Sequence, residues 1–191
     1  EAAKIKKIPL MITYALINRQ TMLNLQDDRS VVKSLLLEGH DVYMIDWGYP
    51  TAEDRYMTMD DHINWYMDDC VEHIRKTTGS NKINLMGICQ GGTFSAIYTA
   101  INPSKINSLI TLVTPIDFET NDALLFRWGK DLNIDSLVDL YGVVPGEVMN
   151  VSYLILKPYT LILDKYIKMI PKMKDKEFLQ KKDRVCIFSQ V

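Results

Sequence analysis

The sequence is poor in cysteine and lacks long apolar runs and any surplus of basic charge. Its three cysteines, Cys70, Cys89 and Cys186, form no CxxC pair. An odd count without close spacing argues against a disulfide framework and favours a reducing compartment. No apolar run approaches the roughly 20 residues that a membrane-spanning helix requires. Lys and Arg number 22 against 24 Asp and Glu, so the basic surplus that nucleic-acid binding requires is missing. We therefore expect neither a membrane span nor a nucleic-acid partner.

Repeats, low-complexity tracts, Gly/Ser linkers and metal-ligand clusters are also missing, which leaves an ordinary globular chain. With 191 residues, 47% of them hydrophobic, it has the size of about one domain and can bury a core without disulfides or metals. The apolar run over residues 8–17 follows three lysines and imitates a secretory signal, but Pro9 and Tyr14 interrupt it and no small-residue cleavage site follows. We predict a buried strand there. The chain begins with Glu1 instead of Met, so we expect a piece of a longer protein.

Strand and helix patterns alternate along the first 115 residues. Short β-rich runs predict strands at residues 9–16, 41–45, 82–86 and 106–113. We predict one helix that begins at Asp27 or Asp28 and ends at Gly39, a second behind a capping box at residues 58–61, and a third at residues 92–100. This alternation implies right-handed crossovers and a parallel sheet with helices on both faces. Beyond Pro115 the apolar residues fall mostly at helical spacings, which predicts a helical cap inserted after the fourth strand.

The motif that carries chemistry is residues 87–92 (GICQGG), between the third predicted strand and its helix. The G-x-C-x-G spacing is that of a nucleophile elbow, with Cys where Ser is commoner, and it indicates an α/β-hydrolase fold. At this sharp turn Cys89 takes strained backbone angles. Only glycine at Gly87 and Gly91 avoids a side-chain clash between helix and strand. The other interpretation of the motif is a buried structural cysteine in a tight glycine turn.

The predicted elbow gathers several groups around the sulfur of Cys89. The turn raises the sulfur above the sheet edge, at the positive end of the following helix, where thiolate is favoured over thiol. The Gln90 N–H points at the oxygen of a tetrahedral intermediate, and a second N–H is expected from Leu16 or Ile17, in the loop after the first strand. A thiolate that attacks a thioester forms another thioester and keeps its group-transfer potential. Cys89 therefore favours acyl transfer from a thioester, such as an acyl-CoA, over lipid hydrolysis.

A histidine base is missing after the predicted nucleophile. In this fold the triad runs nucleophile, acid, histidine along the chain. His40, His62 and His73 all precede Cys89, and we predict them at the surface or at its boundary. Asp117, just past the fourth strand, is predicted to cap the first helix of the cap segment, although an acid occupies this place in some hydrolases. Without a downstream histidine the Cys-His-Asp relay is incomplete, so we expect the chain to be truncated.

The sequence resembles the polyhydroxyalkanoate synthases, and several motifs carry this resemblance. The likeness runs in order through residues 14–19 (YALINR), 28–30 (DRS), 41–50 (DVYMIDWGYP), 85–92 (LMGICQGG), 114–118 (TPIDF), 133–135 (NID) and 144–147 (VPGE). The GICQGG form and the short upstream region are most similar to the catalytic subunit of the two-component class III enzymes, and class IV is the other possibility. Residues 181–191 no longer follow the family pattern, which fits a truncated product.

The resemblance implies an α/β-hydrolase fold in which residues 1–116 form the N-terminal part of the core, residues 117–180 a helical cap and residues 181–191 a divergent tail. It implies an acyltransferase that polymerises (R)-3-hydroxyacyl-CoA, typically 3-hydroxybutyryl-CoA, with release of CoA. Cys89 matches the family nucleophile, which carries the growing polyester chain as a thioester. CoA is then part of the substrate, and no cofactor or metal is implied. The family's catalytic Asp and His lie downstream of the cap and have no counterpart within these residues.

The family also implies a homodimer, a second synthase subunit, and residence on polymer granules in the cytoplasm. Two other functions stay open. One is a Cys-dependent hydrolase of the thioesterase or dienelactone-hydrolase kind, and the other is a non-catalytic, truncated chain that docks to a partner or to granules. We expect weak or absent turnover by this chain even where acylation occurs, because the base is missing. We also expect aggregation, because a sheet without its last strands exposes an apolar edge.

Overall fold

The computed structural model describes residues 5–17, 19–119 and 129–156, together with the single residues Tyr159, Ile167 and Pro171. Contacts within the chain group it into two compact units. The first unit comprises residues 1–48 and 57–116, and the second comprises residues 49–56 and 117–191. The first unit holds a parallel sheet with its helices, and the described elements of the second are helical.

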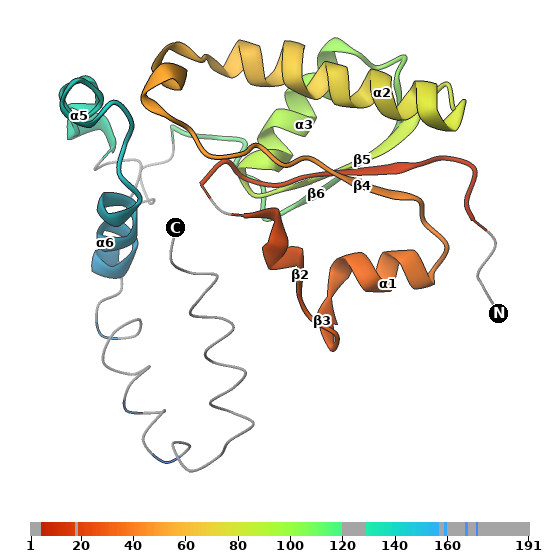
Figure 1. Cartoon of the computed structure of the whole chain (residues 1–191), viewed down its shortest axis with the longest axis horizontal. Coiled ribbons are helices and arrows are strands. Elements are labelled where there is room, and N and C mark those ends of the chain that lie inside the picture. Colours follow the sequence, from red (N-terminus) through yellow and green to blue (C-terminus); the bar gives the residue numbers. More distant parts are fainter. Residues whose placement is uncertain are drawn as a thin grey trace. The chain divides into compact units, whose positions relative to one another are not determined.

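A four-stranded sheet forms the centre of the first unit (Figure 1). Its strands are β1 (Leu10–Thr13), β4 (Val42–Met44), β5 (Ile83–Ile88) and β6 (Ile106–Leu112), in the order β4-β1-β5-β6. All neighbouring strands run parallel, which confirms the parallel sheet predicted from the alternation of strands and helices. Thr13 lies opposite Gly87 in the register of the two central strands. The loop that follows β1 therefore starts beside the predicted elbow.

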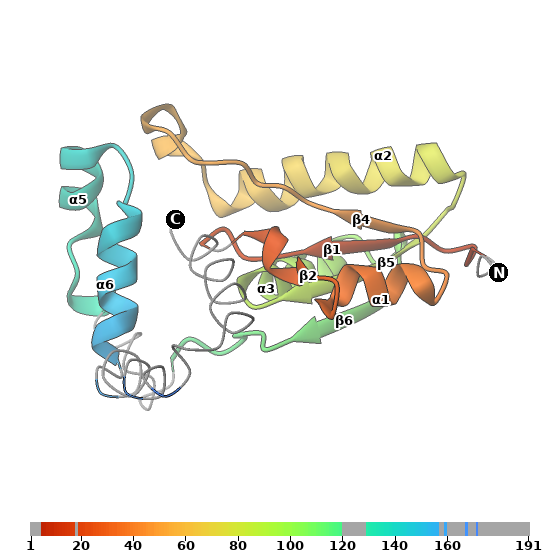
Figure 2. The same ribbon diagram turned by 60° about the horizontal axis from the view of Figure 1, so that its bottom comes forward.

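Helices cover both faces of the sheet, as predicted (Figures 1 and 2). α1 (Val31–Leu37) lies on one face, and α2 (Asp68–Thr78) and α3 (Gln90–Ile101) lie on the other. Because successive side chains of a strand point to opposite faces, β1 and β5 contribute to both cores. Met11 and Leu85 pack with side chains of α2 and α3, whereas Ile12 and Met86 pack with those of α1.

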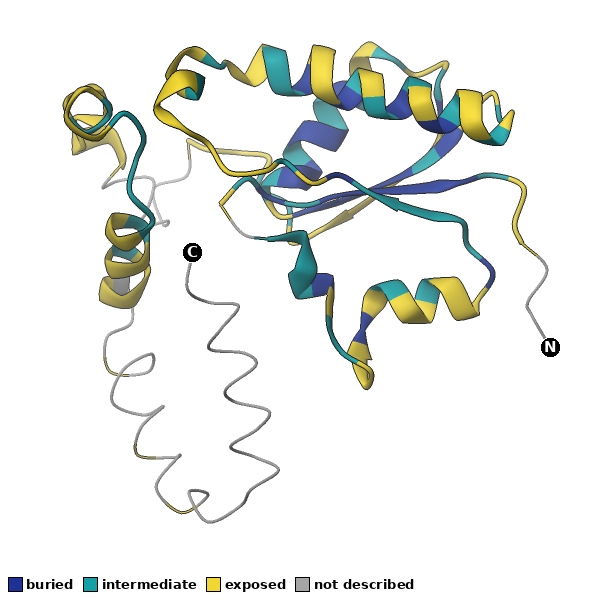
Figure 3. Ribbon diagram, in the orientation of Figure 1, coloured by how far each residue is buried: buried dark blue, intermediate teal, exposed yellow. Residues whose placement is uncertain are grey.

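The central strands are buried, whereas most of β6 is exposed (Figure 3). All four residues of β1 are buried, because β1 has a strand on each side and helices on both faces. In β6 only Ile106 is buried, and Leu109, Ile110 and Leu112 are 37–44% exposed. β6 pairs with β5 on one side and ends the order of the sheet on the other. Within the described residues, β6 is therefore an edge strand with partly exposed apolar side chains.

The first helix begins later than the sequence predicts. Its N-cap is Ser30, whose side chain accepts a hydrogen bond from a backbone N–H of the first turn at 2.8 Å. Neither Asp27 nor Asp28 caps it. The segment before α1 comprises the 3-10 helix η1 (Gln20–Leu23) and the strands β2 (Asn24–Gln26) and β3 (Arg29–Ser30). The two strands pair antiparallel, and Asp27 and Asp28 form the turn between them, so the hairpin takes the residues that the pattern assigned to the helix start.

The buried face of α1 is also narrower than predicted. Val32 and Leu35 pack against the core. The helical spacing of Val31, Val32, Leu35 and Leu36 predicts one apolar face, but Val31 and Leu36 are 41% and 52% exposed. Gly39, with φ 81°, takes the left-handed conformation just after the helix, which confirms it as the end signal.

The helix behind the capping box begins with wide turns. The Thr58 N–H donates to Asp61 Oδ2 at 2.7 Å, and the Asp61 N–H donates to Thr58 Oγ1 at 3.2 Å. These reciprocal bonds confirm the predicted capping box. The segment η3 (Asp61–Met67) then has the hydrogen-bond pattern of a π-helix and leads directly into α2. Apolar periodicity does not distinguish such a segment from an α-helix, and π-helical turns are frequent near functional sites.

An ion network fastens α2 to α3 and to the start of β6. The Asp68 carboxylate accepts hydrogen bonds from the Tyr98 hydroxyl at 2.6 Å and from Lys105 Nζ at 2.5 Å, and Lys105 also pairs with Glu72 at 2.9 Å. Burial opposes the ionisation of Asp68, but the bonds from Lys105 and Tyr98 outweigh it and hold the pKa of Asp68 below its usual value. Burial likewise opposes the charge of Lys105, yet its two carboxylate partners raise its pKa.

We expect Asp68→Asn to lower the free energy of unfolding at pH 7 by about 1–2 kcal/mol, because Lys105 loses one of its two charged partners. Folding depresses the pKa of Asp68, so its contribution is present above the unfolded-state pKa and is lost as the pH falls through the folded-state pKa. The difference between wild type and variant should therefore shrink below about pH 4. Urea unfolding at several pH values measures it. Asp69→Asn removes the same charge from an exposed neighbour, and an equal loss there would contradict the network.

The second unit contains the described helices α5 (Ile134–Tyr141) and α6 (Gly146–Leu156) and the 3-10 helix η2 (Ala52–Tyr56). Asn133 caps α5 by accepting a backbone hydrogen bond at 3.0 Å, and Arg55 pairs with Asp139 at 2.6 Å. The assignment of residues 117–180 to a cap stays a prediction, and the predicted tail, residues 181–191, lies outside the described residues. Within the described part of the chain, no helix has the length and apolarity to cross a membrane.

Candidate active site

The turn between β5 and α3 has the geometry of a nucleophile elbow. Cys89 stands between the two elements with φ 56° and ψ −130°. A residue with a side chain rarely adopts this conformation, which costs about 1–3 kcal/mol. Cys89 is exposed, although Ile88 before it and Gly91 after it are buried. This exposure contradicts the alternative of a buried structural cysteine. The strained turn places the Cys89 thiol at the carboxyl edge of the sheet.

Two positions of the elbow require glycine for steric reasons, as predicted. A Cβ atom on Gly87 would lie 2.4 Å from Gly92 Cα, and a Cβ atom on Gly91 would lie 2.2 Å from the carbonyl oxygen of Thr13. Both of these neighbours are backbone atoms, which cannot move aside without separating α3 from β5 and β1. The two glycines thus allow the start of α3 to lie directly against the sheet.

Hydrogen bonds anchor the elbow to the neighbouring end of β6. The Cys89 N–H donates to the Leu112 carbonyl oxygen at 2.9 Å, and Thr93 Oγ1 donates to the Pro115 carbonyl oxygen at 2.6 Å. Val113, between these two acceptors, has φ 46°, which is a genuine outlier for a β-branched residue. The backbone of the candidate nucleophile is therefore held by a strand end that is itself strained.

The groups expected to stabilise an oxyanion meet through the side chain of Gln90. The Gln90 N–H lies in the first turn of α3, where N–H groups have no acceptor within the helix. Its side-chain oxygen Oε1 accepts a hydrogen bond from the Leu16 N–H at 3.2 Å. The loop after β1 thus reaches the elbow, as expected. Since Gln90 already satisfies the Leu16 N–H, the Ile17 N–H is the stronger candidate for the second donor.

Tyr14 belongs to this site, and sequence reasoning missed it. Burial raises the pKa of the Tyr14 hydroxyl, and the negative charge of ionised Cys89 raises it further. The phenol is therefore a neutral hydrogen-bond donor within electrostatic reach of the sulfur. In the sequence its signal is that Tyr14 directly follows the buried strand β1. It therefore falls at the carboxyl edge of the sheet, where α/β folds bind their ligands. That signal was ambiguous because an aromatic ring also packs, and this ring does pack against the cluster of Ile12 and Met86.

Trp47 holds the loop after β1 through a second hydrogen bond. Its Nε1–H donates to the Tyr14 carbonyl oxygen at 3.0 Å. Its ring packs edge to face on Phe94, with ring centroids 6.0 Å apart, and at a tilt on His62, with centroids 5.4 Å apart. Phe94 lies one turn after Gln90 on α3, so Trp47 ties the loop after β1 to the helix that follows the nucleophile.

The three histidines lie at the surface or at its boundary, as predicted. His40 Nε2 lies 2.7 Å from Lys6 Nζ, and His73 is exposed. His62 Nδ1 lies 2.8 Å from the Thr58 carbonyl oxygen. Because a carbonyl oxygen only accepts, Nδ1 of His62 carries the proton. Among the hydrogen bonds of the described residues, none joins a histidine to Cys89.

Asp117 makes the contact of a capping residue. Its Oδ1 accepts the N–H of Glu119 at 2.9 Å, and its side chain is exposed. A bond to the N–H two residues along is typical of an aspartate in an Asx turn, a local role that is compatible with the predicted capping. Residues 120–128, which follow this bond in the predicted cap, lie outside the described residues, as does Cys186, so the capping role of Asp117 stays a prediction. Within the described ranges, no three His, Cys, Asp or Glu side chains gather as metal ligands do.

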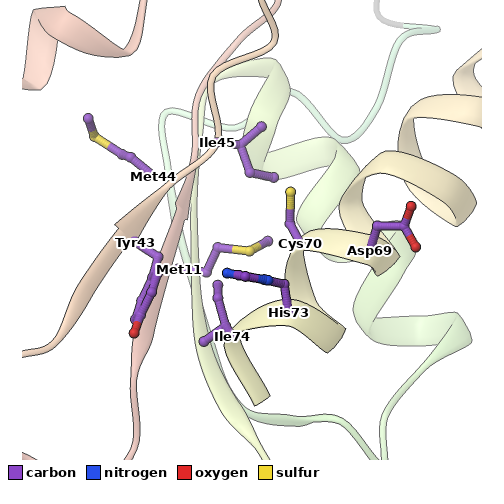
Figure 4. A pocket seen from close by; sticks show the side chains of 8 residues that line it. All are labelled: Met11, Tyr43, Met44, Ile45, Asp69, Cys70, His73 and Ile74. Atoms are coloured by element: carbon purple, nitrogen blue, oxygen red, sulfur yellow. The ribbon is translucent and has the colours of Figure 1, made fainter. Parts of the chain in front are cut away.

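A cavity with a volume of about 310 Å³ lies between β1, β4 and α2, and its lining includes no residue of the elbow (Figure 4). It is lined by Met11, Tyr43, Met44, Ile45, Asp69, Cys70, His73 and Ile74. Cys70 is half-buried against the core. Burial raises the pKa of the Cys70 thiol, and the charge of Asp69 raises it further. The raised pKa keeps the Cys70 thiol protonated, and a protonated thiol is a poor nucleophile.

The elbow, the parallel sheet and the helices on both faces define an α/β hydrolase. The family model of the alpha/beta hydrolase fold matches residues 14–135, and the chain belongs to this family. Among solved structures, the Bacillus licheniformis lipase BlEst2 is similar, with a TM-score of 0.51 and 17% sequence identity, over 77% of this chain and 56% of that chain. At this identity the likeness concerns the fold alone. The α/β-hydrolase fold predicted from the motif is confirmed.

The relatives with higher identity are polymerases. The chain is 49% identical over 174 residues to the poly(3-hydroxyalkanoate) polymerase subunit PhaC of Allochromatium vinosum, over 91% of this chain and 49% of that protein. It is 46% identical over 170 residues to the protein of the same name from Thiocystis violacea, over 89% of this chain and 48% of that protein. The chain thus spans about half the length of these curated relatives. The resemblance to the polyhydroxyalkanoate synthases is confirmed.

Proposed function

We propose that this chain is part of a polyhydroxyalkanoate synthase, an acyltransferase that polymerises (R)-3-hydroxyacyl-CoA, typically 3-hydroxybutyryl-CoA, with release of CoA. The observation that carries the proposal is the exposed Cys89, held at a strained elbow in a chain similar to proteins named as poly(3-hydroxyalkanoate) polymerase subunits. A serine in this place is typical of ester hydrolysis, whereas a cysteine keeps the acyl group activated as a thioester for a second acceptor.

The first step is acylation of Cys89. The Cys89 thiolate attacks the carbonyl carbon of the acyl-CoA, a bond from Sγ to that carbon forms, and the carbonyl π pair moves to oxygen. The N–H groups of Gln90 and Ile17 stabilise the resulting oxyanion. When the intermediate collapses, the bond from carbon to the CoA sulfur breaks, and CoA leaves as a thiolate that takes up a proton from water. CoA thus enters as part of the substrate, and the step needs no cofactor.

The second step is elongation. The 3-hydroxyl group of another substrate attacks the carbonyl carbon of the thioester that holds the growing polyester chain. An ester bond forms, the thioester bond breaks, and the hydroxyl proton passes to a base. The resemblance assigns that proton to a histidine assisted by an aspartate, and the 191 residues hold no counterpart of either. We therefore expect this chain to be acylated but to turn over weakly or not at all.

The proposal extends to partners and location. Both relatives described above carry the word subunit in their names, which supports a second synthase subunit beside this one. The two-component class III enzymes remain the best match, with class IV as the alternative. We further propose a homodimer, and residence on polyester granules in the cytoplasm, where the growing chain accumulates.

We expect radiolabelled (R)-3-hydroxybutyryl-CoA to label the chain at Cys89. Proteolysis followed by mass spectrometry separates the peptides of Cys70, Cys89 and Cys186 and locates the label. Cys89→Ala should remain unlabelled under the same conditions, because alanine offers no nucleophile. Label on Cys70 or Cys186 with Cys89 unmodified would reject the assignment of the nucleophile.

The products of the same incubation separate the synthase from its alternatives. Free 3-hydroxybutyrate in excess over polyester would indicate a Cys-dependent hydrolase, because water would be the acceptor. Unreacted thioester with no label on the protein would indicate a non-catalytic chain. Sequencing the DNA that flanks the coding segment adds a simple control, because an open reading frame that supplies a downstream Asp and His favours the synthase for the parent protein.

A further inference from the structure

The side chain of Gln90 joins two segments that are 74 residues apart in the sequence. Gln90 is the first residue of α3, and Leu16 lies in the loop after β1. The hydrogen bond from the Leu16 N–H to Gln90 Oε1, at 3.2 Å, is half-buried. Gln90 thus contributes twice to the candidate site, because its backbone N–H is one proposed oxyanion donor and its side chain holds the loop that supplies the other.

The loop after β1 is held at two points. Trp47 Nε1–H donates to the Tyr14 carbonyl oxygen at 3.0 Å, and Gln90 Oε1 accepts from Leu16 two residues later. Ala15, between the two points, is 2% exposed, whereas Ile17, beyond the second, is 39% exposed. Of the two bonds, that of Gln90 involves the residue directly before Ile17 in the chain, so we expect it to have the greater influence on the direction of the Ile17 N–H.

We propose that Gln90 is a positioning residue whose side chain sets the separation between its own N–H and the Ile17 N–H. The inference rests on the proposed function, because it concerns the two donors of the proposed acylation step. Placement is decisive there, since each donor must lie about 2.7–3.1 Å from the position that the oxyanion occupies. The hydrogen bond between Gln90 and Leu16, the neighbour of Ile17, therefore constrains the distance between the two N–H groups.

The same hydrogen bond allows a different role, in which Gln90 Oε1 occupies the Leu16 N–H until a substrate carbonyl displaces it. The two roles predict opposite kinetics. A positioning side chain lowers the maximal rate of acylation when it is removed. A displaceable occupant, when it is removed, leaves the maximal rate unchanged and lowers the concentration of acyl donor that gives the half-maximal rate, because substrate no longer competes with it.

The test uses Gln90→Met, which keeps the length of the side chain and removes the acceptor. Acylation of Cys89 is measured with two donors, (R)-3-hydroxybutyryl-CoA and p-nitrophenyl butyrate, and alkylation of Cys89 is measured with iodoacetamide. Attack on either donor passes through an oxyanion, whereas iodoacetamide reacts by displacement of iodide at a CH₂ group and forms none. The ratio of the acylation rate to the alkylation rate therefore reports on the two N–H groups that stabilise the oxyanion. Changes in the exposure or ionisation of the thiol affect both rates and cancel in the ratio.

We expect Gln90→Met to lower this ratio by about 10- to 100-fold, with an unchanged half-saturating concentration of acyl donor. Thr99→Val is the matched control, because it removes a side-chain hydrogen bond of the same helix away from the elbow, from Thr99 Oγ1 to the Ser95 carbonyl oxygen at 2.7 Å. It should leave the ratio at the wild-type value. A general loosening of the helix would lower the alkylation rate or the ratio in both variants alike.

Three outcomes would overturn the inference. These are a wild-type ratio in Gln90→Met, an equal fall in Thr99→Val, and a lower half-saturating concentration at an unchanged maximal rate. The two donors keep the inference apart from the proposed function. Failure of wild-type Cys89 to react with the CoA thioester, with normal reaction of the p-nitrophenyl ester, rejects the synthase while the role of Gln90 is still decided by the ester. Alkylation without acylation by either donor rejects both.

Discussion

Gly91→Ala is expected to lower the free energy of unfolding by about 3 kcal/mol or more, a large part of the roughly 5–15 kcal/mol that stabilise a typical domain. The added Cβ would lie 2.2 Å from the carbonyl oxygen of Thr13, 2.6 Å from its carbonyl carbon and 2.7 Å from the carbonyl oxygen of Tyr14. All three are backbone atoms of β1 or of the loop after it. No rotamer change relieves the contact, so α3 must move away from the central strand. Urea unfolding followed by circular dichroism measures the loss.

Gly79→Ala provides the matched control for this prediction. Gly79 has φ 68°, and no atom lies within 4 Å of a Cβ placed there. Alanine at that position therefore pays for the left-handed backbone alone, about 1–2 kcal/mol. Gly91→Ala should cost clearly more than this, because its penalty is steric. An equal loss in the two variants would contradict the close contact between α3 and β1, and an insoluble Gly91→Ala beside a folded Gly79→Ala would support it.

Cys89→Ser is expected to reduce labelling by (R)-3-hydroxybutyryl-CoA at least about 100-fold, because a serine hydroxyl without an adjacent base is a far weaker nucleophile than a cysteine thiol. The side chain is exposed, so the free energy of unfolding should stay within about 0.5 kcal/mol of the wild-type value. Any adduct that does form is an oxygen ester. It should survive neutral hydroxylamine, which cleaves the thioester of the wild-type protein. Mass spectrometry before and after hydroxylamine distinguishes the two.

Cys70→Ser is the control for the thiol chemistry, because Cys70 lines the cavity beside α2 and lies outside the elbow. It should be labelled at Cys89 as fully as the wild type. Equal labelling of Cys89→Ser and wild type, or loss of label in Cys70→Ser, would mean that the acyl group enters elsewhere. Either result would remove the basis for treating the elbow as the reacting centre.

The sequence predicts the sheet and the elbow well because each leaves a recognisable local pattern of residue types. Alternating strands and helices permit few arrangements, and the parallel order follows from them. The glycines at 87 and 91 are required by contacts of 2.4 Å and 2.2 Å to a notional Cβ, and the spacing of the motif records this requirement. The capping box of Thr58 and Asp61 is likewise a local device, and its two hydrogen bonds form as the pattern predicts.

Predictions from the sequence fail where one residue type suits two local structures, or where contacts between distant segments determine the structure. Asp27 and Asp28 suit a helix start and a hairpin turn equally, and the pairing of β2 with β3 assigns them to the turn. Leu36 continues the apolar period of α1 but is 52% exposed, because the period does not say how wide a face the sheet covers. The bond between Gln90 and Leu16 spans 74 residues, and no local pattern specifies it.

The hydrogen bond from the Cys89 N–H to the Leu112 carbonyl oxygen has a mechanical consequence. It links the end of β6 to the backbone of the candidate nucleophile. Within the described residues β6 ends the order of the sheet, so a strand that paired with its open side would restrain β6 and, through this bond, the turn at Cys89.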